Sequence, residues 1–254
     1  MKILVVNDDG IHEEGFKLLV DIAKQLGEVY ISAPETHQSG KSQAMTLRAP
    51  IKVTDYENLY GAKNAISVVG TPADALRIAM MVYDDIAFDL VLSGVNNGPN
   101  IGSDVHHSGT VGAATEALFF NIPSMAISSP KENFPMVKRY LYNICKDLIE
   151  KKLISTEYVL NINFPSGKFS EPQGIKFSHQ GKHYHKAVFE KTEAGYIALY
   201  APFNVVEDEE SDVHLYKNGY ISITPILENR TDKGFFRTLN SKTQLNEIDS
   251  YDKI

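Results

Sequence analysis

Cysteine is almost absent from this sequence, which contains one Cys and no Trp in 254 residues. The single Cys145 cannot form an intramolecular disulfide, and it excludes zinc sites built from several cysteines. Because chains without disulfides are typical of reducing compartments, we expect a cytoplasmic protein. The apolar run that follows Met1 and Lys2 is also too short for the hydrophobic region of a signal peptide.

Basic residues and long apolar runs are scarce as well. The chain has 25 Lys and Arg against 32 Asp and Glu, a formal net charge of -7 at pH 7, and its basic residues are dispersed. Such a surface repels nucleic-acid backbones and anionic membranes, and no segment approaches the length of a membrane span. We therefore expect neither a nucleic-acid polymer nor a membrane as partner. A small anionic substrate stays possible if a metal ion supplies positive charge.

Short apolar runs alternate with helical patterns over residues 1–165. Strands are expected at 3–6, 28–32, 66–69, 88–92, 124–127 and 158–163, and helices at 16–26, 73–82, 111–120 and 137–152. This alternation predicts an α/β fold with a mainly parallel sheet flanked by helices. Over residues 166–228 only strand patterns follow, which indicates a β-rich extension. The polar segment 229–254 is expected to dock on another subunit, within a chain that forms one domain.

Polar side chains follow three of the predicted strands. Asp8 and Asp9 follow the first, Ser39 comes just after the second, and Asn96 follows the strand at 88–92. Ligands bind beyond the carboxyl ends of strands in open parallel sheets. Carboxylate, hydroxyl and amide oxygens suit Mg²⁺ or Mn²⁺ rather than zinc or copper. A divalent ion would explain two adjacent carboxylates after a buried strand, although Asn-Asp-Asp-Gly also fits a plain turn.

A second polar cluster begins the helix predicted at 111–120. Ser108, Gly109 and Thr110 offer free backbone N–H groups, hydroxyl donors and a residue that permits close approach, which suits a phosphate. Ser108 also fits a simple helix cap, and the neighbouring His106 and His107 fit either a proton donor or loop packing. Metal ligands beside a phosphate site predict phosphoester hydrolysis.

Several stretches of the chain resemble the SurE family, the survival-protein family of metal-dependent nucleotidases. They occur in the order found in that family and reach from Val6 to Ile226: VNDDGI (6–11), QSG (38–40), VVGTPADAL (68–76), SGVNNGPNIG (93–102), DVHHSGTVGAATEA (104–117), NINFP (161–165) and GYISITPI (219–226). The resemblance implies a Rossmann-like core with a β-rich extension, and a C-terminal segment exchanged between subunits of a homodimer or homotetramer.

The resemblance also implies an activity and a site. The activity is hydrolysis of nucleoside monophosphates with one divalent cation, Mg²⁺ or Mn²⁺, by a 5′-nucleotidase that in some members also acts on 3′ esters or polyphosphate. The implied metal ligands are Asp8, Asp9, Ser39 and Asn96, and the implied phosphate contacts are Asn96, Gly40, Ser108, Gly109 and Thr110.

Asp8 and Asp9 are the expected catalytic residues. Water held by the metal and one aspartate is the expected nucleophile, and covalent attack by Asp8 is the alternative that the sequence leaves open. A nucleotide or metal sensor without catalytic activity could use the same pocket, and it is the first alternative function. A phosphoryl-transfer or sugar-transfer enzyme on the same scaffold is the second.

Overall fold

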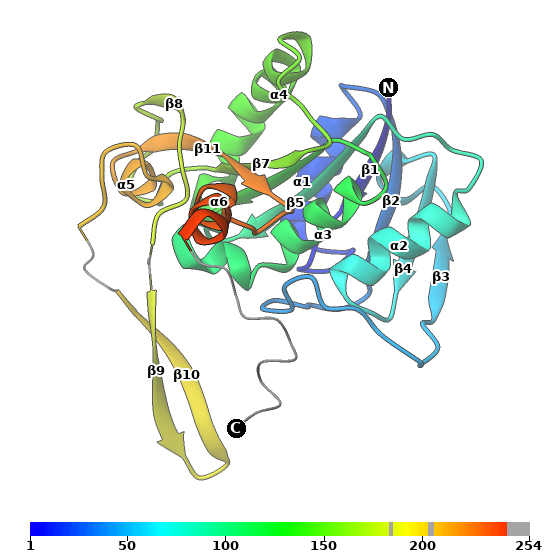
Figure 1. The fold of residues 1–254 in the computed structure, drawn as a ribbon. Helices are drawn as coiled ribbons and strands as arrows, with labels where there is room; N and C mark the ends of the chain where they lie inside the picture. The colour runs from blue at the N-terminus through cyan, green and yellow to red at the C-terminus, as the bar shows by residue number, and fades with distance from the viewer. Residues whose placement is uncertain (183–184, 203–205, 243–254) are drawn as a thin grey trace.

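A nine-stranded sheet forms the centre of the protein, in the strand order β3-β4-β2-β1-β5-β6-β7-β11-β8 (Figure 1). This computed structural model describes residues 1–182, 185–202 and 206–242. The core strands are β1 (Lys2–Val6), β2 (Glu28–Pro34), β3 (Val53–Tyr56), β4 (Asn64–Val68), β5 (Leu90–Asn97), β6 (Ser124–Ser129) and β7 (Tyr158–Asn163).

Helices cover both faces of this sheet, as Figure 1 shows. Side chains alternate between the two faces of a strand. Ile3 and Val5 of β1 accordingly belong to the apolar cluster of α1 (Glu14–Ala23) and α4 (Phe134–Glu150). Leu4 and Val6 belong to the cluster of α2 (Pro72–Val82) and α3 (Gly109–Leu118). Strands β4, β2, β1, β5, β6 and β7 are parallel, and the predicted α/β fold with a mainly parallel sheet is confirmed.

The segment after residue 165 contributes to the same sheet. β11 (Tyr220–Leu227) pairs antiparallel with β7 and parallel with β8 (Gly174–Phe177). β9 (His185–Thr192) and β10 (Gly195–Pro202) form a separate hairpin that extends away from the sheet (Figure 1). The expectation of strands alone in this segment was wrong, because α5 (Asp212–Lys217) is a helix capped by Ser211. Six residues are too few for a recognisable helical period.

The C-terminal segment contains one described helix, α6 (Lys233–Lys242). The predicted roles of residues 243–254 lie outside the described residues, and the division of the chain into core, extension and C-terminal segment remains a prediction. No helix in the described part of the chain is long and apolar enough to cross a membrane.

Cys145 lies fully buried in α4, and burial raises the pKa of its thiol to about 12, so the thiol stays protonated.

The strand order reverses at β1, which lies between β2 on one side and β5 on the other. Helix α1 follows β1 on one face, while α3, which follows β5, covers the opposite face. Such a reversal leaves a crevice beyond the carboxyl ends of the two strands, where open α/β sheets bind their ligands. Asp8, Asp9 and Asn96 come from these two strand ends.

Candidate active site

Asp8 follows the carboxyl end of β1 and is only 2% exposed. The Thr110 hydroxyl donates a hydrogen bond to Asp8 Oδ1 at 2.5 Å. Burial raises the pKa of Asp8 to about 6, because the loss of hydration outweighs this bond, and the negative charge of Asp9 raises it further. His37 and the Thr110 bond oppose this shift only in part.

The N-terminus of α3 lies against Asp8. A Cβ atom added to Gly109 would come within 2.7 Å of Asp8 Cβ and 2.9 Å of Asp8 Oδ2, so this approach requires glycine. Ser108 is the N-cap, and its Oγ accepts a hydrogen bond from Val111 N at 3.1 Å. The predicted cap is confirmed, and its role toward phosphate remains a prediction. The structure thus brings Asp8 together with the Ser108–Thr110 segment.

Asp9 faces β5. Asn97 N donates to Asp9 Oδ2 at 3.1 Å, and His37 Nδ1 lies 3.3 Å from Asp9 Oδ1. Burial raises the pKa of Asp9, while the Asn97 bond and His37 oppose the shift. The pairing of β5 with β6 shifts register between Ser93 and Asn96, an irregularity of the kind that re-aims side chains near functional sites. Asn96 Nδ2 donates to Gly98 O at 2.8 Å, which orients the amide.

Ser39 and Gly40 lie in the exposed loop that follows β2. Gln38 N donates to Asp8 O at 2.7 Å, and this bond fixes the start of the loop beside the aspartates. Gly40 has φ +73°, and an added Cβ atom would meet no atom within 4 Å, so the space next to this backbone is open. Ser39 and Gly40 directly follow Gln38, so the backbone bond of Gln38 brings the start of this predicted segment next to Asp8.

Two carboxylates hold the rest of this loop through hydrogen bonds. The sequence did not connect either of them with the site. Asp74 accepts hydrogen bonds from Thr46 N at 2.9 Å and Thr46 Oγ1 at 2.7 Å, and it also caps α2. The buried Glu116 of α3 accepts a bond from Gln43 Nε2 at 2.7 Å and pairs with Arg77. These partners are 28 and 73 residues apart in the chain, so no local pattern reveals them.

Asparagines from β7 hold the loop between β5 and α3. Asn100 N donates to Asn163 Oδ1 at 2.8 Å, and Asn161 Nδ2 donates to Asn100 O at 2.8 Å. Asn100 in turn donates to Ser128 Oγ at 2.8 Å. The NINFP stretch (161–165) carries part of the family resemblance, and its physical role is to fix the chain at Asn100, eight residues before Ser108.

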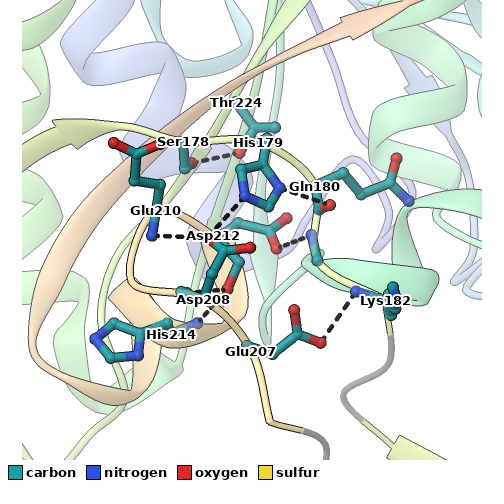
Figure 2. A network of polar contacts seen from close by, with 12 residues as sticks. Ser178, His179, Gln180, Lys182, Glu207, Asp208, Glu210, Asp212, His214 and Thr224 are labelled. Carbon is teal, nitrogen blue, oxygen red and sulfur yellow. Dashed lines mark hydrogen bonds and ion pairs between the residues drawn. The ribbon is translucent and has the colours of Figure 1, made fainter.

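A buried carboxylate from α5 holds the same loop further along, where Figure 2 shows Asp212 beside His179, Gln180 and Asp208. Asp212 is fully buried and accepts bonds from Gly181 N at 2.8 Å and Gly102 N at 3.1 Å. Gln180 Nε2 donates to Gly102 O at 2.8 Å. Through its bond to Gly102 N, Asp212 positions the turn that leads into the Ser108 cap.

Replacing Asp212 with Asn tests the charge of this carboxylate. Burial raises the pKa of Asp212 above its ordinary 3.8, so just above pH 3.8 the folded protein keeps a proton that the unfolded chain has released. The free energy of unfolding contributed by this group is therefore greatest below that pH and falls as the pH rises through the folded-state pKa. We expect Asp212→Asn to remove this fall, so that its stability relative to wild type increases as the pH rises across the range.

Denaturant unfolding of both proteins at several pH values between 3.5 and 7 measures this difference. The comparison cancels the titration of the other acids, because both proteins share them. A difference in unfolding free energy that stays constant with pH would contradict the assignment.

The oxygen groups at this edge of the sheet fit a hard divalent cation. The described residues contain no cluster of three or more His, Cys, Asp or Glu that could hold a metal, so a metal here would depend on two carboxylates with amide and hydroxyl oxygens. Within the described part of the chain, neither Asp8 nor Asp9 pairs with Lys or Arg. A buried and a partly buried carboxylate, with the His37 imidazole as the nearest printed basic group, suit Mg²⁺ or Mn²⁺.

Comparison with known proteins gives concordant matches. Residues 3–187 match the family described as Survival protein SurE. The proteins named 5′-nucleotidase SurE from Alkaliphilus metalliredigens and Syntrophomonas wolfei are each 36% identical, over 95% and 91% of this chain and 98% and 90% of their own lengths. The crystal structure of the SurE protein from Aquifex aeolicus aligns with a TM-score of 0.80 and 30% identity, over 95% of this chain and 99% of that one.

Proposed function

This chain belongs to the SurE family, and from that membership we propose that it is a 5′-nucleotidase, a phosphoric monoester hydrolase that releases phosphate from nucleoside monophosphates with a divalent cation. The observation that carries the proposal is the contact between buried Asp8 and the N-terminus of α3, where Thr110 donates to the carboxylate and Gly109 lies against it. This contact joins a candidate metal ligand to a candidate phosphate site.

The residues have distinct proposed roles. Asp8 and Asp9 would hold Mg²⁺ or Mn²⁺ with Ser39 and Asn96, and the bound ion would polarise a phosphoryl oxygen and lower the pKa of water. The substrate phosphate lies against Gly40, Asn96 and the Ser108–Thr110 segment, where free N–H groups of α3 and the helix dipole favour a negative charge.

Thr110 keeps the Asp8 carboxylate in place through its 2.5 Å hydrogen bond. Water is the proposed nucleophile, and one of the two aspartates orients it. We further propose activity on 3′ esters and polyphosphate, a cytoplasmic location, and assembly as a homodimer or homotetramer.

Phosphate release from AMP tests the function. We expect hydrolysis with added Mn²⁺, and we expect EDTA to lower the rate at least about a hundredfold, because the ion supplies several kcal/mol of transition-state stabilisation. Excess Mn²⁺ should restore the rate. Tight AMP binding without phosphate release would instead favour the alternative function, a nucleotide sensor that uses the same pocket.

A further inference from the structure

A pocket of about 370 Å³ lies between the N-terminal half of α3 and the end of β11. Helix α3 contributes the face that carries Ser108, Val111 and Thr115, while Ile226 of β11 lies on another wall. Ser42 and Gln180 come from segments far apart in the sequence and complete the lining. Of the lining residues, only Ser108 belongs to the proposed metal and phosphate site.

Two chain segments connect the proposed phosphate site with the wall of this pocket. The first contains Ser108, which belongs to the phosphate site and also lines the pocket. The second is the loop after β2, which carries Gly40. Ser42 lines the pocket two residues later, so the chain separates it from Gly40 by no more than about 7 Å. Ser42 N donates to His107 O at 3.0 Å and Ser42 Oγ donates to His106 O at 2.8 Å, so the two segments are joined at this point. A ligand bound at the phosphate site can therefore extend into the pocket.

The chemistry of the lining suits a partly apolar group that also carries hydrogen-bonding atoms. Val111 and Ile226 offer apolar surface, and the side-chain amides of Gln43 and Gln180 can meet polar edges. Gln180 is held by its bond to Gly102 O and lies 3.3 Å from His106 Nε2. Figure 2 shows its side chain turned away from the His179 ring.

The charge of the pocket argues against a chain of phosphates as its ligand. Apart from His106, its charged lining residues are Glu228 and Arg230, which have opposite signs. A polyanion would need several cationic side chains, because each charged phosphate must be compensated as it loses hydration. A nucleoside carries no such charge.

We propose that this pocket binds the base and sugar of the nucleotide, and that Gln180 is a specificity-determining residue which hydrogen-bonds the nucleoside. This inference rests on the proposed function. It assigns the esterified phosphate to the Ser108–Thr110 segment and the nucleoside to the face of α3 that carries Val111 and Thr115.

The experiment compares two phosphomonoesters on two variants. AMP carries a nucleoside, whereas glycerol phosphate offers the same ester without one. With Mn²⁺ present, we expect Gln180→Ala to lower kcat/KM for AMP about tenfold, through KM, because one hydrogen bond to the ligand is lost. The rate with glycerol phosphate should change less than twofold. Thr115→Phe, which fills the pocket from α3, should give the same pattern, so the test does not depend on one variant.

Gln173→Ala is the matched control, because Gln173 precedes β8 in the same segment and lines a different pocket with Lys176 and Tyr220. This variant should leave kcat/KM unchanged for both substrates. Equal losses for AMP and glycerol phosphate in both pocket variants, or no change with either substrate, would overturn the assignment of this pocket to the nucleoside. The proposed function would stand. If the unaltered protein hydrolysed neither ester, the proposed function itself would fall and the assignment with it.

Discussion

An Asp8→Asn protein is expected to lose phosphate release from AMP by about a thousandfold, which corresponds to about 4 kcal/mol of activation free energy. Asp8 is buried at the end of β1, and its carboxylate has no Lys or Arg partner among the described residues. An asparagine keeps the shape and can still accept the Thr110 hydrogen bond, but it removes the negative charge that would hold the cation. Steady-state kinetics with saturating Mn²⁺ measure the loss.

The same substitution should not destabilise the protein in EDTA. Burial raises the pKa of Asp8 to about 6 from 3.8, so keeping the carboxylate ionised at pH 7 costs about 3 kcal/mol of folding free energy. A neutral asparagine avoids this cost, and the melting temperature should stay equal or rise. A low rate together with a higher melting temperature would distinguish lost chemistry from lost folding.

Asp89→Asn provides the matched control for this prediction. Asp89 precedes β5 at the opposite end of the sheet, where it accepts a hydrogen bond from Lys2 N at 2.7 Å. Its replacement should leave kcat/KM within twofold of wild type. If Asp8→Asn retained full activity while folded, the proposed role of Asp8 would be wrong.

A Gly109→Ala protein is expected to lose activity on the order of a hundredfold, since a displacement of about 1 Å in a catalytic constellation has an effect of that size. The new methyl group would lie 2.7 Å from Asp8 Cβ, 2.9 Å from Asp8 Oδ2 and 3.0 Å from Pro72 Cγ. Asp8 or the start of α3 must therefore move. Both the rate with AMP and the apparent affinity for Mn²⁺ should fall, because the metal ligand and the phosphate site separate.

Gly167→Ala is the control for added volume, because its Cβ atom would meet Glu132 only at 3.6 Å or more, an ordinary contact. This variant should keep both activity and metal affinity. Unchanged kinetics in Gly109→Ala would show that close approach of α3 to Asp8 is not needed for the reaction.

Alternating apolar runs were sufficient to predict the core of the fold. Strands such as Ile3–Val6 are buried on both faces, and buried parallel strands read as continuous aliphatic runs. The expected strand at 158–163 agrees with β7, and the helix expected at 73–82 differs from α2 by one residue at its start. Fold class is thus accessible from periodicity, and the family match over residues 3–187 supports the resemblance seen in the motifs.

Long-range contacts explain what the sequence could not predict. Asp74 fits a local cap, yet its carboxylate also holds Thr46 of the loop after β2. Asp212 lies in a helix of six residues, and its partner Gly102 is 110 residues away. Neither contact has a periodic or local signature, because each arises only when the sheet brings distant loops together. The proximity of Asp8 to Thr110 could be predicted in outline, since both follow strands that end at the same edge.

The central claim is that Asp8 and Asp9 together hold one divalent cation. Calorimetric titration of Mn²⁺ into EDTA-stripped, desalted protein tests it most directly, with Asp8→Asn titrated in parallel. We expect one ion bound per chain in the unaltered protein, and binding at least about a hundredfold weaker in Asp8→Asn, because a carboxylate ligand is lost. Absence of Mn²⁺ binding to the unaltered protein, or equal affinity in the two proteins, would contradict the account.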